Sequence, residues 1–476
     1  MTDGRRVLRR GPRQASGLGL NALAGGAALV LLLAALSGCG GGAAPALRFG
    51  APLALSSNAA TDSGDDSAPI VVTDGASTWV VVWTSQDDLK GTIGNDGDIL
   101  VSRSTDDGAT WSDPRPLNSG AATDEGSDGP VDMTTDGAGN WLAVWASRDS
   151  LGGTIGGEGD ILAARSSDNG ATWTSAVALS ASAPIDKGSD TAPHVSADED
   201  GNWLVVWATR DSLGGAIGDD GDILVSRSTD AGVTWTPPAP LNTNARHDRG
   251  LDLDPVVTGD GSGNWVAAWS SYSDLGGPIG TDRDVLVSRS TDVGATWSDP
   301  APLNANASTD TGDDLTPYLA VDEAGNWIAA WSSSDTLDNS TGSDNDILFS
   351  RSRDGGSTWS DPAALNTTAR SDERSDESPQ VMTDGKGWLA VWFSIKTPGA
   401  NVIGLDIDSL FSRSSDGGAT WTVPAVLNGG AGGDAGFDLY PHVAGSGGRW
   451  LAVWESRAGP DGSASPDSDI LYSLAR

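Results

Sequence analysis

Short apolar runs recur along the chain after residue 46, and each is bounded by clusters of glycine, aspartate and asparagine. The clearest run is Trp79–Trp83, in which three valines separate two tryptophans. A run with tryptophan at both ends follows six more times. Apolar runs of this length between turn-forming residues are typical of buried β-strands. No segment long enough for a helix lies between them, so the pattern predicts an all-β protein.

Four strand-like segments make up one repeat. The first follows a proline, as in Pro69–Val72, and the second is the tryptophan run. The third resembles Asp98–Arg103, and the fourth runs from Trp111 to Asn118. The first three segments occur seven times, and the fourth follows them only six times.

The missing fourth strand is expected at the start of the repeat region. Leu47–Leu55 resembles the segment that begins at Thr110. This N-terminal strand would complete the last sheet and close a ring, which protects strand edges that an open array would expose. We therefore predict a seven-bladed β-propeller of four-stranded blades.

The motif Ser-x-Asp-x-Gly-x-x-Trp stands between the third and fourth segments and recurs every 62 residues. Its aspartate can accept hydrogen bonds from nearby backbone N–H groups, and its glycine tolerates a positive φ angle. Its tryptophan can then bury a large apolar face. We interpret the motif as a structural turn, and its aspartates are Asp106, Asp168, Asp230, Asp292, Asp354 and Asp416.

This motif resembles the Asp box of BNR repeat, or sialidase-like, β-propellers. All six copies keep all four residues, and threonine stands before each tryptophan. The resemblance implies a propeller in which the box joins the third and fourth strands of each blade. It implies no activity, because Asp boxes also occur in lectin-like, receptor and structural propellers.

Two acidic loop series are expected on the face opposite the Asp boxes, because successive strands of a blade alternate in direction. One series precedes the first strand, and the other joins the second strand to the third. Oxygen-rich loops of this kind suit Ca²⁺. We expect Ca²⁺ between these loops in blades one to four, with turn-capping or solvated aspartates as the alternative. The candidate ligands are Asp96, Asp98, Asp219, Asp220 and Asp222.

Blades five to seven depart from the loop sequence that the first four blades share, and so do several residues that follow the first-strand proline. First strands line the central channel of a propeller. We therefore place a candidate ligand pocket there, with drift of a decaying repeat as the alternative. Its residues are Tyr318, Gln380, Lys396, Tyr440, His442, Glu455 and Arg457.

The formal net charge is −37, which disfavours nucleic acid as a partner and favours cations or basic partners. Cys39 is the one cysteine, so no intrachain disulfide is possible. All 20 tryptophans fall in the repeats and are expected to form much of the core. We expect a monomer, with calcium as the one candidate cofactor.

The first residues resemble a bacterial lipoprotein signal. Arg5, Arg6, Arg9 and Arg10 form a basic region before the uncharged segment 17–36, and small residues lead to Cys39. The resemblance implies a signal peptide at 1–38, lipidation of Cys39, a flexible tether at 39–46 and a propeller at 47–476. The protein would then be exported and anchored in the bacterial envelope, at the outer membrane or cell surface. An uncleaved membrane anchor is the alternative.

Sialidases of the resembled family use an arginine trio, a Tyr–Glu nucleophile pair, an Asp acid and an F/Y-R-I-P motif. That motif is absent here, where glycine follows Arg48 and Phe49, and no catalytic residues are assigned. We predict non-catalytic binding of a glycan or protein ligand on the acidic loop face. The alternatives are a sialidase-like glycoside hydrolase (an exo-α-sialidase) and a mainly structural envelope component.

Overall fold

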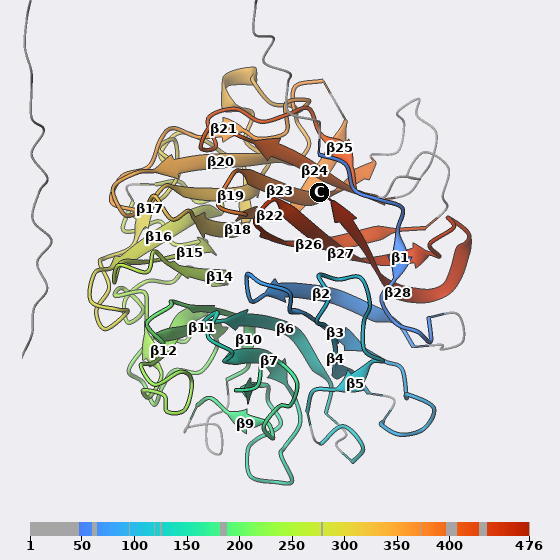
Figure 1. Cartoon of the computed structure of the whole chain (residues 1–476). Helices are drawn as coiled ribbons and strands as arrows, with labels where there is room; N and C mark the ends of the chain where they lie inside the picture. Colours follow the sequence, from blue (N-terminus) through green and yellow to red (C-terminus); the bar gives the residue numbers. More distant parts are fainter. Residues whose placement is uncertain are drawn as a thin grey trace, which may run out of the picture. The chain divides into compact units, whose positions relative to one another are not determined.

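Seven four-stranded antiparallel sheets make up the part of the chain that the computed structural model describes (Figure 1). This part comprises residues 47–59, 64–94, 96–118, 120–123, 126–180, 188–277, 279–371, 373–396, 407–427 and 436–475. Cys39 and the proposed tether lie outside it. A 3₁₀ turn at Leu337–Asn339 is the one helical element among the described residues, and none of these residues forms a helix long and apolar enough to cross a membrane.

Six blades contribute their strands in chain order from the channel outward, and blade seven does so for three strands and takes its outermost strand from β1. The first strands are β2 (Asp66–Thr73), β6 (Asp128–Thr135), β10 (Asp190–Ala197), β14 (Asp252–Gly259), β18 (Asp314–Val321), β22 (Arg374–Thr383) and β26 (Asp438–Ser446). The second strands are β3 (Trp79–Ser85), β7 (Trp141–Ser147), β11 (Trp203–Thr209), β15 (Trp265–Ser271), β19 (Trp327–Ser333), β23 (Trp388–Lys396) and β27 (Arg449–Ala458).

The outer strands follow in the same order. The third strands are β4 (Asp98–Ser104), β8 (Asp160–Ser166), β12 (Asp222–Ser228), β16 (Asp284–Ser290), β20 (Asp346–Ser352), β24 (Ile407–Ser414) and β28 (Ala464–Ala475). The fourth strands are β5 (Arg115–Pro116), β9 (Val177–Ala178), β13 (Ala239–Pro240), β17 (Ala301–Pro302), β21 (Ala363–Ala364), β25 (Ala425–Val426) and, for blade seven, β1 (Leu53–Ala54).

The core lies between neighbouring blades. Both tryptophans of every second strand are buried, because residues four apart on a strand lie on the same face and both pack against the same neighbouring blade. Trp265 and Trp269 of β15, for example, pack with Leu204 and Val206 of β11 in one apolar cluster. Each large apolar side chain buried in this way contributes about 1.5–3 kcal/mol. Because no backbone ladder joins one sheet to the next in the described part of the chain, side-chain packing is a main link between the blades.

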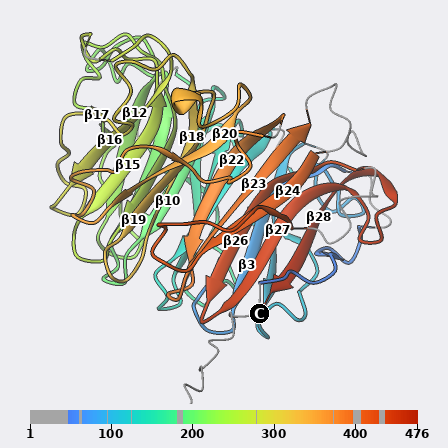
Figure 2. The ribbon, with the colours of Figure 1, turned by 90° about the horizontal axis from the view of Figure 1, so that it is seen from above.

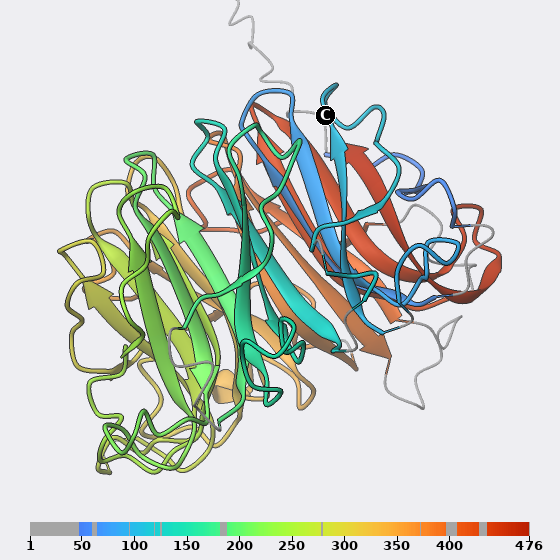
Figure 3. The same cartoon turned by 90° about the horizontal axis from the view of Figure 1, so that it is seen from below.

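The N-terminal strand closes the ring, as the sequence predicted. Leu53 of β1 pairs with Tyr472 of β28, and Phe49 forms a further bridge to Ala475. Figures 1 and 3 show the first blade, in blue, standing beside the last blade, in red, and Figure 2 shows β3 behind β26 and β27 of the last blade. The first and last strands of the described chain thus lie in one sheet.

Two strand boundaries differ from the prediction. The fourth strands have only two paired residues, where a strand from Trp111 to Asn118 was expected. Pro114 and Pro116 lack an N–H donor and limit the ladder in blade one, whereas β9 is equally short although its segment 173–180 contains no proline. The first strands begin two to five residues before their proline instead of after it, and their register shifts at a bulge there.

Candidate functional site

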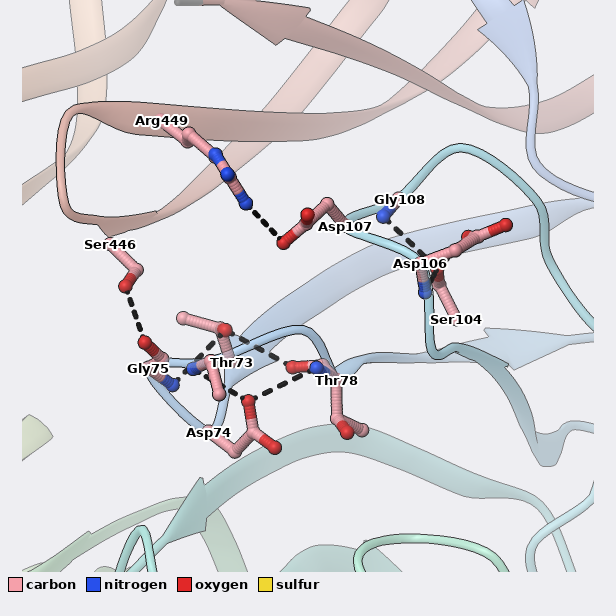
Figure 4. A network of polar contacts seen from close by, with 11 residues as sticks. Thr73, Asp74, Gly75, Thr78, Ser104, Asp106, Asp107, Gly108, Ser446 and Arg449 are labelled. Carbon is pink, nitrogen blue, oxygen red and sulfur yellow. Dashed lines mark hydrogen bonds and ion pairs between the residues drawn. The ribbon is translucent and has the colours of Figure 1, made fainter.

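The Asp boxes form closed hydrogen-bond systems on one face of the ring (Figure 4). In the first box, Gly108 N–H donates to Ser104 Oγ at 3.0 Å, and Thr110 N–H donates to Asp106 Oδ1 at 2.8 Å. The other five boxes repeat these contacts. Hydrogen bonds from Thr234 lower the pKa of Asp230 to about 2, so this carboxylate is fully occupied as an acceptor. This face therefore consists of turn structure.

The same face joins the last blade to the first. Arg449 forms an ion pair with Asp107, and Ser446 Oγ donates to the Gly75 carbonyl at 2.7 Å (Figure 4). These contacts span the closure point of the ring.

Residues from all seven first strands line two hollows along the central channel. One has a volume of about 290 Å³ and is rimmed by the seven first-strand prolines. The other has a volume of about 360 Å³. His194, Tyr318 and His442 line both hollows, so they lie where the two meet. Together with Asp132 and Gln380 they form what we call the polar layer.

The polar layer brings together three of the predicted ligand residues. Gln380 Nε2 donates to Tyr318 Oη at 3.1 Å and lies 2.7 Å from His442 Nε2. Asp132 and His194 belong to the same layer, although the sequence analysis did not select them. His194 occupies the same position after the first-strand proline as Tyr318, Gln380 and His442, and this equivalence could have identified it.

Most hydrogen-bond acceptors of the polar layer already accept a hydrogen bond from a neighbouring blade. Asp132 Oδ2 accepts from Val195 N–H at 2.7 Å, and Gln380 Oε1 accepts from Val443 N–H at 2.7 Å. His194 Nδ1 and His442 Nδ1 each lie 3.3 Å from the N–H of the next first strand. The layer therefore links first strands that share no sheet hydrogen bonds with one another.

Burial keeps the histidines of the layer neutral. Burial, together with the charge of the nearby His194, lowers the pKa of His442 to about 3. Burial also lowers the pKa of His194 and raises that of Asp132, while their mutual attraction at 3.9 Å opposes both shifts.

Tyr440 lines the proline-rimmed hollow together with Tyr318, Gln380 and His442, whereas Lys396, Glu455 and Arg457 are not among its lining residues. Tyr440 is exposed at the channel mouth, where its ring packs edge-on against Phe393 at 5.4 Å. Arg457 donates to Asp65 and Ser468 at the junction of blades seven and one, and its charge also acts on Glu455. Lys396 is the last residue of β23. The seven residues therefore do not form one pocket.

The acidic loops meet at the seams between blades. At the seam of blades three and four, Gly218 N–H donates to the Ala245 carbonyl at 2.8 Å and ties the two loops together. Asn242 Nδ2 donates to Asp222 and Asp252, both at 2.9 Å. Asn304 occupies the equivalent place at the next seam.

Two groups of carboxylates converge at these seams, and each group has oxygens within 4.8 Å of one another. The groups are Asp222, Asp248 and Asp252, and Asp282, Asp284 and Asp310. Burial, together with neighbouring carboxylates, raises the pKa values of Asp222 and Asp284 to about 7 and those of Asp248 and Asp310 to about 6.

The five predicted metal ligands divide between blades one and three. Asp220 acts electrostatically on Asp222, which is fully buried, whereas Asp219 is exposed. In blade one, Asp98 is buried at the start of β4, and Asp96 lies two residues before it.

A cleft of about 670 Å³ opens beside the seam of blades three and four. Asn244, His247 and Arg249 contribute polar groups to it from one loop, and Tyr272 contributes an aromatic ring from the other. The Tyr272 side chain is 41 % exposed, and the guanidinium of Arg283 lies 4.7 Å from its ring centre. The sequence analysis missed this cleft. Tyr272 replaces the Gln or Arg that blades one to three carry directly after the second strand, and this difference was the available signal.

A family model described as BNR repeat-like domain matches residues 77–317, half of the chain. The protein belongs to this family. The match extends over the blades that contain the cleft and both carboxylate groups.

Solved structures share the fold. The chain is similar to a protein of unknown function from Dyadobacter fermentans DSM 18053, with 15 % identity and a TM-score of 0.50 over 91 % of this chain and 100 % of that one. It is also similar to the Hadza microbial sialidase Hz136, with 18 % identity and a TM-score of 0.46 over 83 % and 76 % of the two chains. An ulvan lyase of family PL25 gives 12 % identity and a TM-score of 0.49 over 89 % and 93 %. No curated protein matches the chain.

Proposed function

We propose that this protein is an exported, lipid-anchored propeller that binds a neutral glycan without cleaving it. The binding site is the cleft beside Tyr272, on the acidic loop face. The observation that carries this proposal is the combination of an exposed aromatic ring with several donors and acceptors in one cleft.

The size and chemistry of the cleft support a sugar ligand. Its volume of about 670 Å³ lies within the ordinary range for small-ligand sites. Sugar hydroxyls both donate and accept hydrogen bonds, and the exposed Thr281 hydroxyl offers both functions while Arg249 donates. The apolar C–H faces of a sugar ring can pack on an aromatic ring such as Tyr272.

The charges favour a neutral sugar over an anionic one. Among the described residues, Arg249 is the one arginine that lines any of the three cavities. Binding of a sugar carboxylate typically uses bidentate arginine contacts. Asp248 and Asp274 also line the cleft, and the net charge of −37 repels anions.

The channel is a weaker candidate than the cleft. Gln380 and Asp132 already accept backbone hydrogen bonds between blades. A ligand that used these groups would have to break those contacts, and each would cost about 1 kcal/mol.

Replacing Tyr272 by alanine is expected to reduce retention on neutral glycans at least tenfold, because the aromatic surface of the cleft is lost. The measurement is binding of residues 47–476 to a glycan array, with release of terminal sugars recorded in parallel. The matched control is Phe437→Ala, which removes another exposed aromatic ring on a different blade and should leave retention unchanged.

Three outcomes would contradict this proposal. Equal retention by Tyr272→Ala and the unaltered protein would exclude the cleft. Release of terminal sialic acid would favour the hydrolase instead. Absence of retention on all glycans would remove the glycan and leave a protein ligand or a structural role.

The lipid anchor makes a separate prediction. With Cys39 intact, the full chain is expected to fractionate with membranes and partition into detergent, whereas Cys39→Ala should do neither. Ser37→Ala keeps a small residue before the cysteine and serves as the control. Membrane association of Cys39→Ala equal to that of the unaltered chain would favour the uncleaved anchor.

A further inference from the structure

Two neighbouring seams carry equivalent sets of four oxygen-bearing side chains. One seam joins blades three and four, the other joins blades four and five, and the two sets lie one repeat apart in the sequence. At the first seam they are Asp220 and Asp222, from the loop before β12 and its first residue, with Asn244 and Asp248 from the loop before β14. At the second seam they are Asp282, Asp284, Asn306 and Asp310. We call these the seam sites.

Each seam site contains buried side-chain oxygens that accept no hydrogen bond. At the first site these atoms are Oδ2 of Asp220 and Asp222 and Oδ1 of Asn244 and Asp248. The second site leaves the same four atom types without a partner, namely Oδ2 of Asp282 and Asp284 and Oδ1 of Asn306 and Asp310. Asp222 and Asp284 are at most 1 % exposed. A buried oxygen without a donor is costly, and its recurrence in two blades indicates a shared ligand.

The surrounding contacts hold the side chains in this arrangement. Asn244 Nδ2 donates to Asp248 Oδ2 at 2.6 Å, and Asn306 Nδ2 donates to Asp310 Oδ2 at 2.8 Å. This contact leaves Oδ1 of the asparagine and Oδ1 of the aspartate for the ligand. A Cβ atom at Gly218 would lie 2.2 Å from Asp220 Oδ1, so glycine is needed for the loop to approach this carboxylate.

The missing partner is a cation. Three carboxylates at each seam repel one another, and none of the four ion pairs among the described residues involves them. All four side chains would bind a ligand through an oxygen atom, and three of the four are carboxylates. Calcium accepts six to eight such ligands, including water, in flexible geometry, whereas zinc prefers nitrogen and sulfur.

We propose that each seam site binds one Ca²⁺ ion through these four side chains, with water completing the coordination. The ions would cross-link the loops of successive blades, and the proposal does not depend on whether the cleft binds a glycan. The sequence predicted calcium in each of blades one to four, whereas this proposal assigns it to two seams only. Gly120 of blade one and Glu158 of blade two replace members of the set, as does Thr368 of blade five.

The test compares metal-free residues 47–476 with the same protein titrated with CaCl₂ at physiological ionic strength. Calorimetry should show two Ca²⁺ ions bound per chain, and saturation should raise the Tm by about 5 °C. Mg²⁺, which requires tighter octahedral geometry, should bind at least tenfold more weakly.

Matched variants separate the seam sites from the general negative charge. Asp220→Asn and Asp282→Asn should each remove one bound ion, and the double variant should remove both. Asp219→Asn removes an exposed carboxylate next to Asp220 and should retain two ions. Because the asparagine variants relieve repulsion, their metal-free forms should melt no lower than the metal-free unaltered protein.

The proposal would be overturned by an unchanged Tm with saturating Ca²⁺, or by weak binding that does not saturate at two ions. Equal losses in Asp219→Asn and Asp220→Asn would also overturn it, because they would trace the binding to surface charge. If Tyr272→Ala abolishes glycan retention but still binds Ca²⁺, both proposals hold and the two properties are separate.

Discussion

Removing residues 47–55 is expected to open the ring and to destabilise the propeller by about 5 kcal/mol or more. These residues supply the fourth strand of blade seven. Leu55 is 4 % exposed within the core, and Phe49 packs edge-on against Phe411 at 5.1 Å. Backbone hydrogen bonds from Gly50 to Leu474 and from Leu55 to Ile470 would be lost as well. The exposed edge of β28 should then promote association between chains.

The measurement is thermal unfolding and size-exclusion chromatography of residues 56–476 beside residues 47–476. A synthetic peptide of residues 47–55 should restore part of the lost Tm. Single variants give a milder comparison if the truncated chain does not fold. Leu55→Ala should cost about 2–5 kcal/mol, whereas Leu53→Ala, on the same strand but 51 % exposed, should cost less than about 0.5 kcal/mol. Equal Tm values for the long and short chains would refute closure by this strand.

Acid is expected to weaken the propeller through His442. The folded-state pKa of this histidine is about 3, below its usual value of 6.5. Between these values the unfolded chain binds the proton that the folded chain excludes, so the free energy of unfolding falls as pH falls from 6.5 toward 3. The slope from one such group approaches about 1.4 kcal/mol per pH unit.

His442→Gln should flatten this dependence by about 1 kcal/mol per pH unit between about pH 6 and pH 4. Glutamine occupies the equivalent position in blade six, where Gln380 bonds across the blade seam. The neighbouring His194 acts in the same direction as His442, and Asp132, whose pKa is raised, acts in the opposite one. Both remain in the variant, so the difference between the two proteins reports on His442.

The control for this experiment is His247→Gln, which alters an exposed loop histidine. Its pH dependence should match that of the unaltered protein. Urea unfolding at several pH values gives both slopes. A His442→Gln variant that loses stability in acid as steeply as the unaltered protein would show that His442 does not control this response.

The sequence determined the architecture because every blade repeats the same local pattern. Two tryptophans in each second strand, a turn motif every 62 residues and one displaced strand at Leu47–Leu55 were enough to set the blade number and the closure. The sequence also placed the acidic loops on one face, since strand direction alternates. It did not predict the short fourth strands, which pair over two residues even in blade two, where the segment contains no proline.

Only the tertiary structure decided how the candidate site residues divide. Tyr318, Gln380 and His442 meet in the channel although they are one repeat apart, whereas Arg457 pairs with Asp65 at the ring junction. Comparing the blades in the sequence identified unusual residues. It could not show which of their polar atoms already have hydrogen-bond partners in neighbouring residues. The unpartnered oxygens of Asp222 and Asn244 come from two loops, and the tyrosine of the cleft comes from a third segment. Their convergence depends on how blades pack against one another, and that packing is fixed by buried apolar surface rather than by the loops themselves.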